Sequence, residues 1–189
     1  KFINAIKNPS EYIPIDISKE FLLKNAKKFA KQNPELKVTA ICADFIKSNF
    51  DDIIKKKKKT KVGFFPGSTI GNFSPSKAKT LMKKISKILG RKSYLVIGVD
   101  LKKEKHILEK AYNDSEGITA KFNKNILQGL NNLCGSTFDL SNFEHEAFFN
   151  KKKNRVEMHL KSNKIHKVEI MGTQILFKKG ETIHTENSY

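Results

Sequence analysis

The first hundred residues alternate short apolar runs with amphipathic stretches of helical period. Four runs of strand length lie at residues 12–16, 37–43, 61–65 and 93–99. Between them, apolar positions at a period near 3.6 predict one helix that begins after Ser18 and another that runs from Pro75 to Leu89. Strands that alternate with helices are typical of parallel βαβ units, in which ligands bind at the carboxyl ends of the strands.

The second half of the chain has a different pattern. Helical stretches at 103–111 and 119–133 are followed by short runs joined by polar turns. These runs lie at residues 144–149, 155–161, 164–170 and 175–178. Turns at residues 150–154 and 171–173 predict an antiparallel meander. We therefore expect an α/β domain over residues 1–102 and a second, smaller α+β domain over residues 103–189.

Length and composition indicate a globular protein that needs no disulfide framework. The 189 residues suffice for one domain or two small ones. No apolar run approaches the roughly 18 residues of a membrane span, and Cys42 and Cys134 fall in no CxxC or ligand spacing. The histidines lie at His106, His145, His159, His166 and His184. Without HxxxH or HExxH spacing they predict no metal site, and we expect a soluble, cytoplasmic monomer that has no membrane partner.

The formal net charge of +18 raises the alternative of a nucleic-acid-binding module. Only two of the 37 basic residues, Arg91 and Arg155, are arginine, the residue best suited to bidentate recognition of phosphates and bases. The lysines are spread along the whole chain, and the run at 55–59 is typical of a solvated connector. We interpret the charge as compositional background and expect no nucleic-acid partner.

The loop PGSTIGN, at residues 66–72, follows the third predicted strand. Its glycines, Gly67 and Gly71, allow the backbone to pass close to a ligand, and the Asn72 amide offers both a donor and an acceptor. The spacing is neither that of a P-loop nor GxGxxG. A purely structural strand-to-helix turn explains the loop equally well.

Acidic residues end two of the predicted strands. Asp16 is placed as a carboxylate that accepts from the two hydroxyls of a ribose. Asp44 and Phe45 offer an acceptor for an exocyclic amine and a ring to contact an adenine face. The alternative, nearly even for Asp44, is that such acids cap the following helices.

The final motif, GETIHTENSY, covers residues 180–189. Glu186 and Ser188 lie two residues apart, so in an extended segment their side chains point to the same face. A carboxylate beside a hydroxyl suits an imidazole or an amide ligand. The alternative is an ordinary polar edge strand.

Seven strings, taken in order, resemble the histidine-specific Nα-methyltransferases of ergothioneine biosynthesis. They are YIPIDIS, ADF, VGFFPGSTIGNF, YLVIGVDL, AYNDSEGITAKFNKN, VEMHL and GETIHTENSY. The resemblance covers essentially all 189 residues. It implies a Rossmann-like domain with a second, substrate-binding domain. It also implies transfer of three methyl groups from S-adenosylmethionine (SAM) to the α-amine of free L-histidine, which gives hercynine. The family's glycine-rich cofactor motif has no counterpart here, so we expect a fragment of a longer chain.

The resemblance also implies roles for individual residues. Asp16 would hold the ribose of SAM, and Asp44 with Phe45 its adenine. Asn72 and Tyr112 would hold the amino and carboxylate groups of histidine. The pair that recognises the imidazole would be Glu186 and Ser188. The remaining pocket residues would be Gly67, Thr69, Thr119 and Met158. A related enzyme that methylates another small amine or amino acid remains the nearest alternative, and the charge of +18 keeps an RNA methyltransferase as a more distant one.

Overall fold

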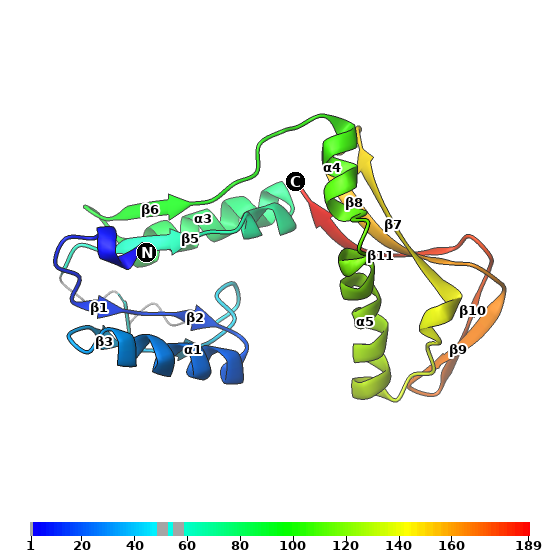
Figure 1. The fold of residues 1–189 in the computed structure, drawn as a ribbon, viewed down its shortest axis with the longest axis horizontal. Helices are drawn as coiled ribbons and strands as arrows, with labels where there is room; N and C mark the ends of the chain where they lie inside the picture. Colours follow the sequence, from blue (N-terminus) through cyan, green and yellow to red (C-terminus); the bar gives the residue numbers. More distant parts are fainter. Residues whose placement is uncertain (1, 49–52, 55–58) are drawn as a thin grey trace. The chain divides into compact units, whose positions relative to one another are not determined.

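The computed structural model describes residues 2–48, 53–54 and 59–189 (Figure 1). The chain divides into two compact units. The first contains Lys1–Gly63 and Leu81–Tyr94, and the second contains Phe64–Thr80 and Leu95–Tyr189. Residues 64–80 and 95–102 thus group with the second unit, although the sequence predicts a single boundary after residue 102. Most of the lysine run predicted as a connector, residues 55–58, lies outside the described residues.

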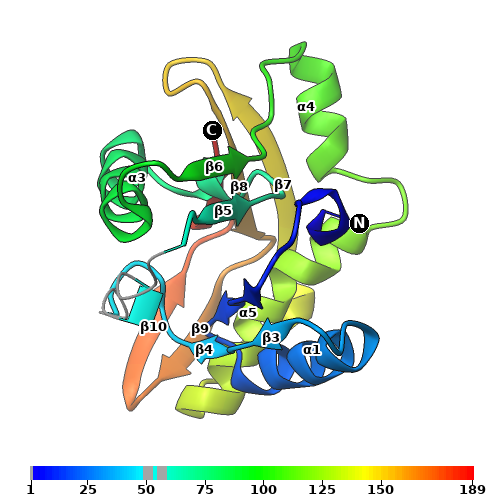
Figure 2. The same ribbon diagram turned by 90° about the vertical axis from the view of Figure 1, so that its left-hand side faces the viewer.

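The first unit contains parallel strand pairs, as the sequence predicts. After the short 3-10 helix η1 (Ile3–Ala5), β1 (Glu11–Tyr12) pairs with β3 (Lys37–Val38), and β2 (Ile15–Asp16) pairs with β4 (Ile41–Cys42). The helix between them, α1 (Lys19–Gln32), lies beside these strands (Figure 2). The predicted strand at 12–16 is split because Pro14 has no N–H to donate; its carbonyl still accepts from the Ile41 N–H at 2.9 Å.

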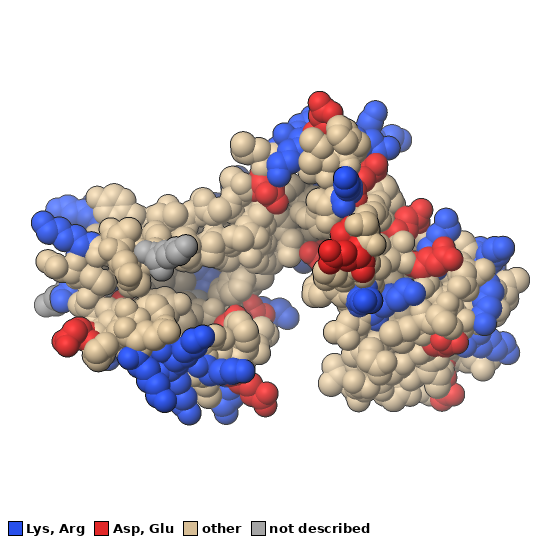
Figure 3. Space-filling view, viewed as in Figure 1, with Lys and Arg blue, Asp and Glu red and all other residues tan. Residues whose placement is uncertain are grey.

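A small apolar cluster forms the core of the first unit. Ile41, Ile54 and Ile88 are buried together, and four partly buried residues pack against them: Ile13, Ile15, Ala43 and Phe45. Leu22 and Ala26, one turn apart, are the buried side chains of α1. Lysines gather on the exposed side of this helix (Figure 3). Such a one-sided distribution is typical of a solvated amphipathic helix.

Two further predictions concern residues 62–97, which contain one helix and two strands. The predicted helix is present as α3 (Pro75–Leu89), which begins with proline and ends before Gly90, whose φ is +77°. The predicted strands are β5 (Val62–Phe65) and β6 (Tyr94–Ile97), which pair with each other. The PGSTIGN loop contains the 3-10 helix η2 (Thr69–Asn72).

The second unit is built on an antiparallel sheet of order β11-β8-β7. Its strands are β7 (Phe143–Asn150), β8 (Arg155–Ser162) and β11 (Thr182–Ser188), and β7 follows the 3-10 helix η3 (Leu140–Asn142). The strands β9 (His166–Ile170) and β10 (Thr173–Phe177) form a separate hairpin, so the predicted continuous meander is wrong after β8. The Ser162 N–H donates to Glu181 O and the Gly180 N–H to Ser162 O. The hairpin segment therefore leaves the sheet at Ser162 and returns beside it, and β11 becomes the neighbour of β8.

Helices α4 (Lys105–Tyr112) and α5 (Ile118–Cys134) cover one face of this sheet (Figure 1). The main core cluster contains Leu127, Phe138, Phe143, Leu160, Val168 and Phe177. A second cluster contains Ala147, Val156 and Met158, with Leu108, Tyr112 and Phe149 packed against it. Alternate residues of β8 enter these clusters, so Glu157 and His159 belong to the opposite face of the sheet. Among the described helices, none is both long and apolar enough to cross a membrane.

Candidate functional site

Strand β11 brings the predicted imidazole-binding pair to the face covered by the helices. Glu186 lies opposite Met158 and Ser188 opposite Val156 in the register with β8. Tyr112, the last residue of α4, donates its phenolic hydrogen to Ser188 Oγ at 2.7 Å. The Tyr112 ring packs against the cluster that contains Met158. Four predicted substrate residues, from α4, β8 and β11, therefore share one region of the second unit.

The PGSTIGN loop meets the end of β11. The Tyr189 N–H donates to Gly71 O at 2.9 Å. A Cβ on the buried Gly71 would lie 3.0 Å from Tyr189 O and 3.6 Å from Ser188 Oγ, so the close approach requires glycine. Asn72 follows directly and its side chain is exposed. The loop is thereby fixed beside the predicted imidazole-binding pair.

The Glu186 carboxylate is half-buried, and within the described part of the chain it has no hydrogen-bond or ion-pair partner. Burial raises the pKa of Glu186 above its ordinary value because desolvation disfavours the charged form. A carboxylate that has lost part of its water without gaining a protein partner is prepared to accept hydrogen bonds from a ligand.

The backbone of Tyr112 is held by a buried polar network. The Tyr112 carbonyl only accepts, so His145 Nε2 carries the hydrogen that donates to it at 2.8 Å. His145 Nδ1 then accepts from Asn123 Nδ2 at 2.9 Å, and the same amide donates to His159 O at 3.1 Å. His145 is thus a hydrogen-bonded structural residue, as the sequence predicts. Its bond to the Tyr112 carbonyl holds the backbone at the end of α4 in place.

Thr119 lies at the start of α5, where Asp114 holds the helix terminus. The Asp114 carboxylate accepts from the Ile118 N–H at 2.7 Å and from the Thr119 N–H at 2.8 Å. The Thr119 side-chain hydrogen bond and these two backbone bonds lower the pKa of Asp114 to about 2. Thr119 is therefore hydrogen-bonded to Asp114, and among the described residues it has no hydrogen bond with Tyr112 or Glu186.

The other two predicted pocket residues lie in the PGSTIGN loop. Gly67 has a φ of +74° and is exposed, and Ser68 after it also has a positive φ, of +56°. Thr69 Oγ1 donates to Pro66 O at 3.4 Å. Both residues therefore shape the loop, whose 3-10 helix η2 contacts β11.

The predicted cofactor residues all belong to the first unit. Asp16 Oδ1 accepts from the Ser18 N–H at 2.8 Å; the Ser18 side chain itself makes no cap hydrogen bond. Asp44 Oδ1 accepts from the N–H groups of Ile46 and Lys47, which lower the pKa of Asp44. Asp44 Oδ1 thus caps the turn at residues 45–47, where the sequence interpretation expected a helix. The Oδ2 atoms of both carboxylates have no partner within the described residues, so each keeps an acceptor for a ligand.

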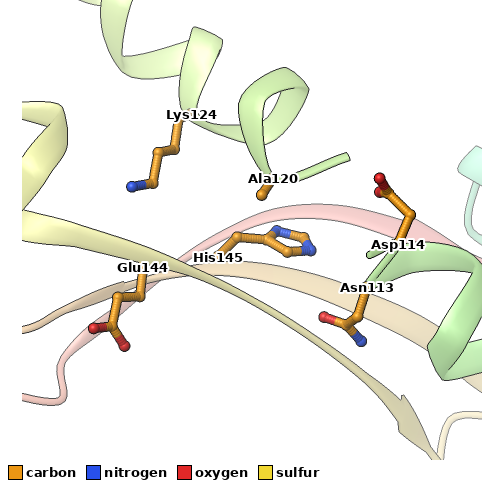
Figure 4. Close-up of a pocket in the computed structure, with 6 residues that line it drawn as sticks. All are labelled: Asn113, Asp114, Ala120, Lys124, Glu144 and His145. Atoms are coloured by element: carbon orange, nitrogen blue, oxygen red, sulfur yellow. The ribbon is translucent and has the colours of Figure 1, made fainter. Parts of the chain in front are cut away.

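A pocket of about 390 Å³ lies beside the Tyr112 segment (Figure 4). It is lined by Asn113, Asp114, Ala120, Lys124, Glu144 and His145. None of these residues belongs to the predicted substrate set, and the His145 ring that enters the pocket already has partners for both nitrogens. The pocket is thus a neighbour of the candidate site rather than the site itself.

Residues 1–189, the whole chain, match the family described as "Histidine-specific methyltransferase, SAM-dependent". The chain belongs to this family. The resemblance carried by the sequence motifs is thereby confirmed.

Curated members of the histidine-specific methyltransferase family resemble this chain over most of its length. It is 31% identical to the histidine N-alpha-methyltransferase of Mycolicibacterium smegmatis and 29% identical to that of Mycobacterium tuberculosis. Each match covers 94% of this chain and 55% of the relative, so the chain spans about half the length of these proteins. Ergothioneine biosynthesis protein 1 of Neurospora crassa is 34% identical over 97 residues, which are 44% of this chain and 11% of that protein.

Asp114 and His145 shape the site of this family member without a functional prediction from the sequence, and Gly71 carries only the general prediction that its backbone passes close to a ligand. A local signal existed for Asp114, because an acid shortly before a helix start interacts favourably with the free N–H groups there. The roles of Gly71 and His145 depend on contacts with segments more than 30 residues away in the sequence. No spacing rule reveals such contacts.

Replacing Asp114 with asparagine is expected to lower the melting temperature near pH 7. The folded-state pKa of about 2 lies below the ordinary 3.8, so this carboxylate stabilises the fold above about pH 4. That stabilisation is lost as the pH falls toward 2, and the difference between the two proteins should shrink over the same range. Circular dichroism melts between pH 2 and 7 measure it. Glu116→Gln, which removes an exposed charge two residues away, should leave the melting temperature nearly unchanged.

Proposed function

We propose that this protein transfers methyl groups from SAM to the α-amine of free L-histidine, up to the trimethylated product. The observation that carries the proposal is the meeting of Tyr112, Glu186 and Ser188 on one face of the β11-β8-β7 sheet, beside η2. The curated relatives that match most of the chain are named for histidine N-alpha-methylation.

The recognition of the imidazole follows from the donors and acceptors of the pair on β11. A neutral imidazole has one N–H donor and one nitrogen acceptor. The Glu186 carboxylate accepts, and it has no competing partner within the described residues. Ser188 Oγ already accepts from Tyr112, so its own hydrogen is available to donate. Together the two side chains complement a neutral imidazole. An apolar ring in the same place would leave the carboxylate and the hydroxyl without partners.

The amino and carboxylate groups of histidine are assigned to Asn72 and Tyr112. Asn72 is exposed next to the fixed Gly71, and its amide supplies both a donor and an acceptor. Gly67, Thr69, Thr119 and Met158 complete the proposed substrate pocket. The Met158 side chain is 3% exposed and supplies an apolar wall opposite Glu186.

Methyl transfer to an amine is an in-line displacement. Bound SAM supplies the electrophilic methyl group. The reaction therefore needs an unprotonated, aligned amine more than a strong acid or base, and positioning of this kind contributes up to about 7–11 kcal/mol in favourable systems. This requirement matches a site built from tyrosine, asparagine and glutamate.

The two halves of the chain are proposed to have different roles, one in cofactor binding and one in substrate binding. Residues 1–102 would form a Rossmann-like domain, which the parallel pairs β1–β3 and β2–β4 support. Residues 103–189 would form the smaller α+β substrate-binding domain, which the helix-covered antiparallel sheet supports. We further propose a monomeric, cytoplasmic enzyme without a nucleic-acid or membrane partner.

The proposed function is tested by mass spectrometry of a reaction that contains the complete protein, SAM and all free amino acids. Histidine that gains one, two and then three methyl groups is the expected result. Methylation of a different amino acid would contradict the imidazole assignment and leave the methyltransferase reaction intact. Absence of any product, together with binding to nucleic acid that falls steeply with salt, would favour the nucleic-acid alternative.

Replacing Asp16 with asparagine is expected to weaken SAM binding about 10-fold. A carboxylate accepts from both ribose hydroxyls, whereas an amide offers one oxygen and no charge, and a hydrogen bond to a charged group contributes about 1.5–3 kcal/mol in typical cases. Isothermal titration with SAM measures the change. Glu20→Gln removes an exposed acid from the first turn of α1 and should bind SAM as the wild type does. Equal affinities for all three proteins would contradict the assignment.

A further inference from the structure

The face of the β11-β8-β7 sheet opposite the helices carries a second cluster of functional side chains. Glu157 and His159 lie two residues apart on β8, so they point to the same side, and His184 on β11 lies directly opposite His159. One carboxylate oxygen of Glu157 and one nitrogen of each histidine all lie within 4.8 Å of one another. Two ligands from one strand and a third from its antiparallel neighbour thus surround a single point.

We propose that Glu157, His159 and His184 bind a divalent transition metal ion, with Zn²⁺ as the expected ion. Three protein ligands leave one of four tetrahedral positions open for water or another small ligand. Two imidazoles and one carboxylate form a donor set typical of zinc sites with an open position. Mg²⁺ and Ca²⁺ prefer sites made only of oxygen ligands, so neither is expected to bind here.

The Glu157 carboxylate is oriented by partners that occupy only one of its oxygens. Oε1 accepts from Arg155 Nε at 2.8 Å and from Arg155 Nη2 at 2.6 Å; the Asn150 amide and the Lys153 ammonium also contact it. Among the described residues, Oε2 has one hydrogen-bond partner, His159 Nε2 at 3.4 Å. The partners of Oε1 hold the carboxylate in place and leave Oε2 available to a metal ion.

Both histidines have a second partner that selects the nitrogen left for the metal. His159 Nδ1 lies 3.3 Å from Thr182 Oγ1, and His184 Nε2 lies 3.2 Å from the carbonyl oxygen of Glu186. A carbonyl only accepts, so His184 Nε2 carries a hydrogen and Nδ1 has the free lone pair. A hydrogen bond from the nitrogen that does not bind the metal is the usual way in which proteins fix a histidine ligand.

The ligand atoms lie within 4.8 Å of one another, and one pair already has the spacing of a bound site. Ligands about 2.1 Å from a zinc ion at tetrahedral angles lie about 3.4 Å from one another, the separation already present between Glu157 Oε2 and His159 Nε2. The rings of His159 and His184 are stacked, with centroids 4.5 Å apart. His184 is the exposed member of the pair, so its ring has room to turn out of the stack and bring a nitrogen to the ion.

A further polar atom on this face, in the side chain of Asn187, lacks a hydrogen-bond partner among the described residues. Asn187 lies opposite Glu157 in the register of β11 with β8. Its Oδ1 atom is buried and has no hydrogen-bond partner within the described residues. A buried acceptor of this kind normally has a partner, and a water molecule in the open metal position would provide a donor.

The test is isothermal titration of the complete, untagged, chelator-treated protein with Zn²⁺. One ion per chain is expected, and His184→Ala and His159→Ala should each weaken binding at least 100-fold. The matched control is His106→Ala, because His106 is also an exposed histidine with a carboxylate, Glu104, within 3.2 Å, but it lies on α4. This variant should bind Zn²⁺ as the wild type does.

A second measurement covers the risk that His159→Ala does not fold, because the His159 side chain is only 12% exposed. Zn²⁺ should raise the melting temperature of the wild type and of His106→Ala, and leave that of His184→Ala unchanged. Absence of saturable Zn²⁺ binding, or binding and stabilisation that survive in His184→Ala, would overturn the proposal. Histidine methylation is a separate readout, so failure of the metal site leaves the proposed function untouched.

Discussion

Replacing Glu186 with alanine is expected to lower the affinity for L-histidine about 100-fold and to remove the preference for histidine over other aromatic amino acids. The half-buried carboxylate has no partner among the described residues, so in the proposed complex it accepts from the imidazole N–H. Loss of a hydrogen bond to a charged group accounts for about 1.5–3 kcal/mol. An apolar ring is rejected by the wild type because it would leave the carboxylate desolvated and unpaired, and alanine removes that penalty.

Competition assays that contain histidine, phenylalanine and tyrosine measure this change directly. Glu169→Ala is the matched control, because Glu169 is an exposed carboxylate on β9 of the same unit. The control should keep both the affinity and the preference of the wild type. An unchanged preference for histidine in Glu186→Ala would show that the imidazole is recognised elsewhere.

Removing the charge of Glu186, which is expected to weaken histidine binding, is expected to stabilise the fold at high pH. Burial raises the pKa of Glu186, so the folded state holds this proton more tightly than the unfolded chain does. The group's favourable contribution is complete below the ordinary value of 4.5 and is lost as the pH rises through the raised pKa. Glu186→Gln should therefore melt at a higher temperature than the wild type at pH 8 and at an equal temperature at pH 4. Calorimetry at the two pH values measures the difference.

Local sequence patterns predict the bounds of helices and strands better than they predict which strands pair. The bounds of α3 follow from Pro75 and Gly90, because proline and glycine act within one turn of the chain. The neighbour of β8 was not predictable in this way. The hydrogen bonds of Ser162 with Gly180 and Glu181 join residues about twenty positions apart, and a tight turn at 171–173 is compatible with either sheet order.

In the candidate site too, local spacing was predictable and contacts between distant segments were not. Period-two spacing placed Glu186 and Ser188 on one face, and the register with β8 confirms that they share it. The bond between Tyr112 and Ser188 spans 76 residues, so only the family resemblance suggested that they belong together. The proposed metal ligands are a sharper case: Glu157 and His159 are neighbours by spacing, but the third ligand becomes visible only when β11 is paired with β8.

The close approach of η2 to β11 leads to a second large effect. Replacing Gly71 with alanine is expected to reduce kcat/KM for histidine about 100-fold and to destabilise the fold by about 1–3 kcal/mol. The new Cβ would lie 3.0 Å from Tyr189 O and 3.5 Å from Tyr189 N, and backbone atoms on both sides leave little freedom to adjust. The end of β11 must therefore shift, and the Ser188 hydroxyl shifts with it away from Tyr112.

Gly129→Ala is the control for this substitution, because a Cβ at Gly129 in α5 meets nothing within 4 Å. Alanine in a helix interior is favoured over glycine by about 0.5–1 kcal/mol, so this variant should be slightly more stable and fully active. Steady-state kinetics and denaturant melts of the two variants separate the effect of the contact from that of an added methyl group. If Gly71→Ala kept wild-type kinetics, the end of β11 would tolerate displacement, and Ser188 would not position the substrate.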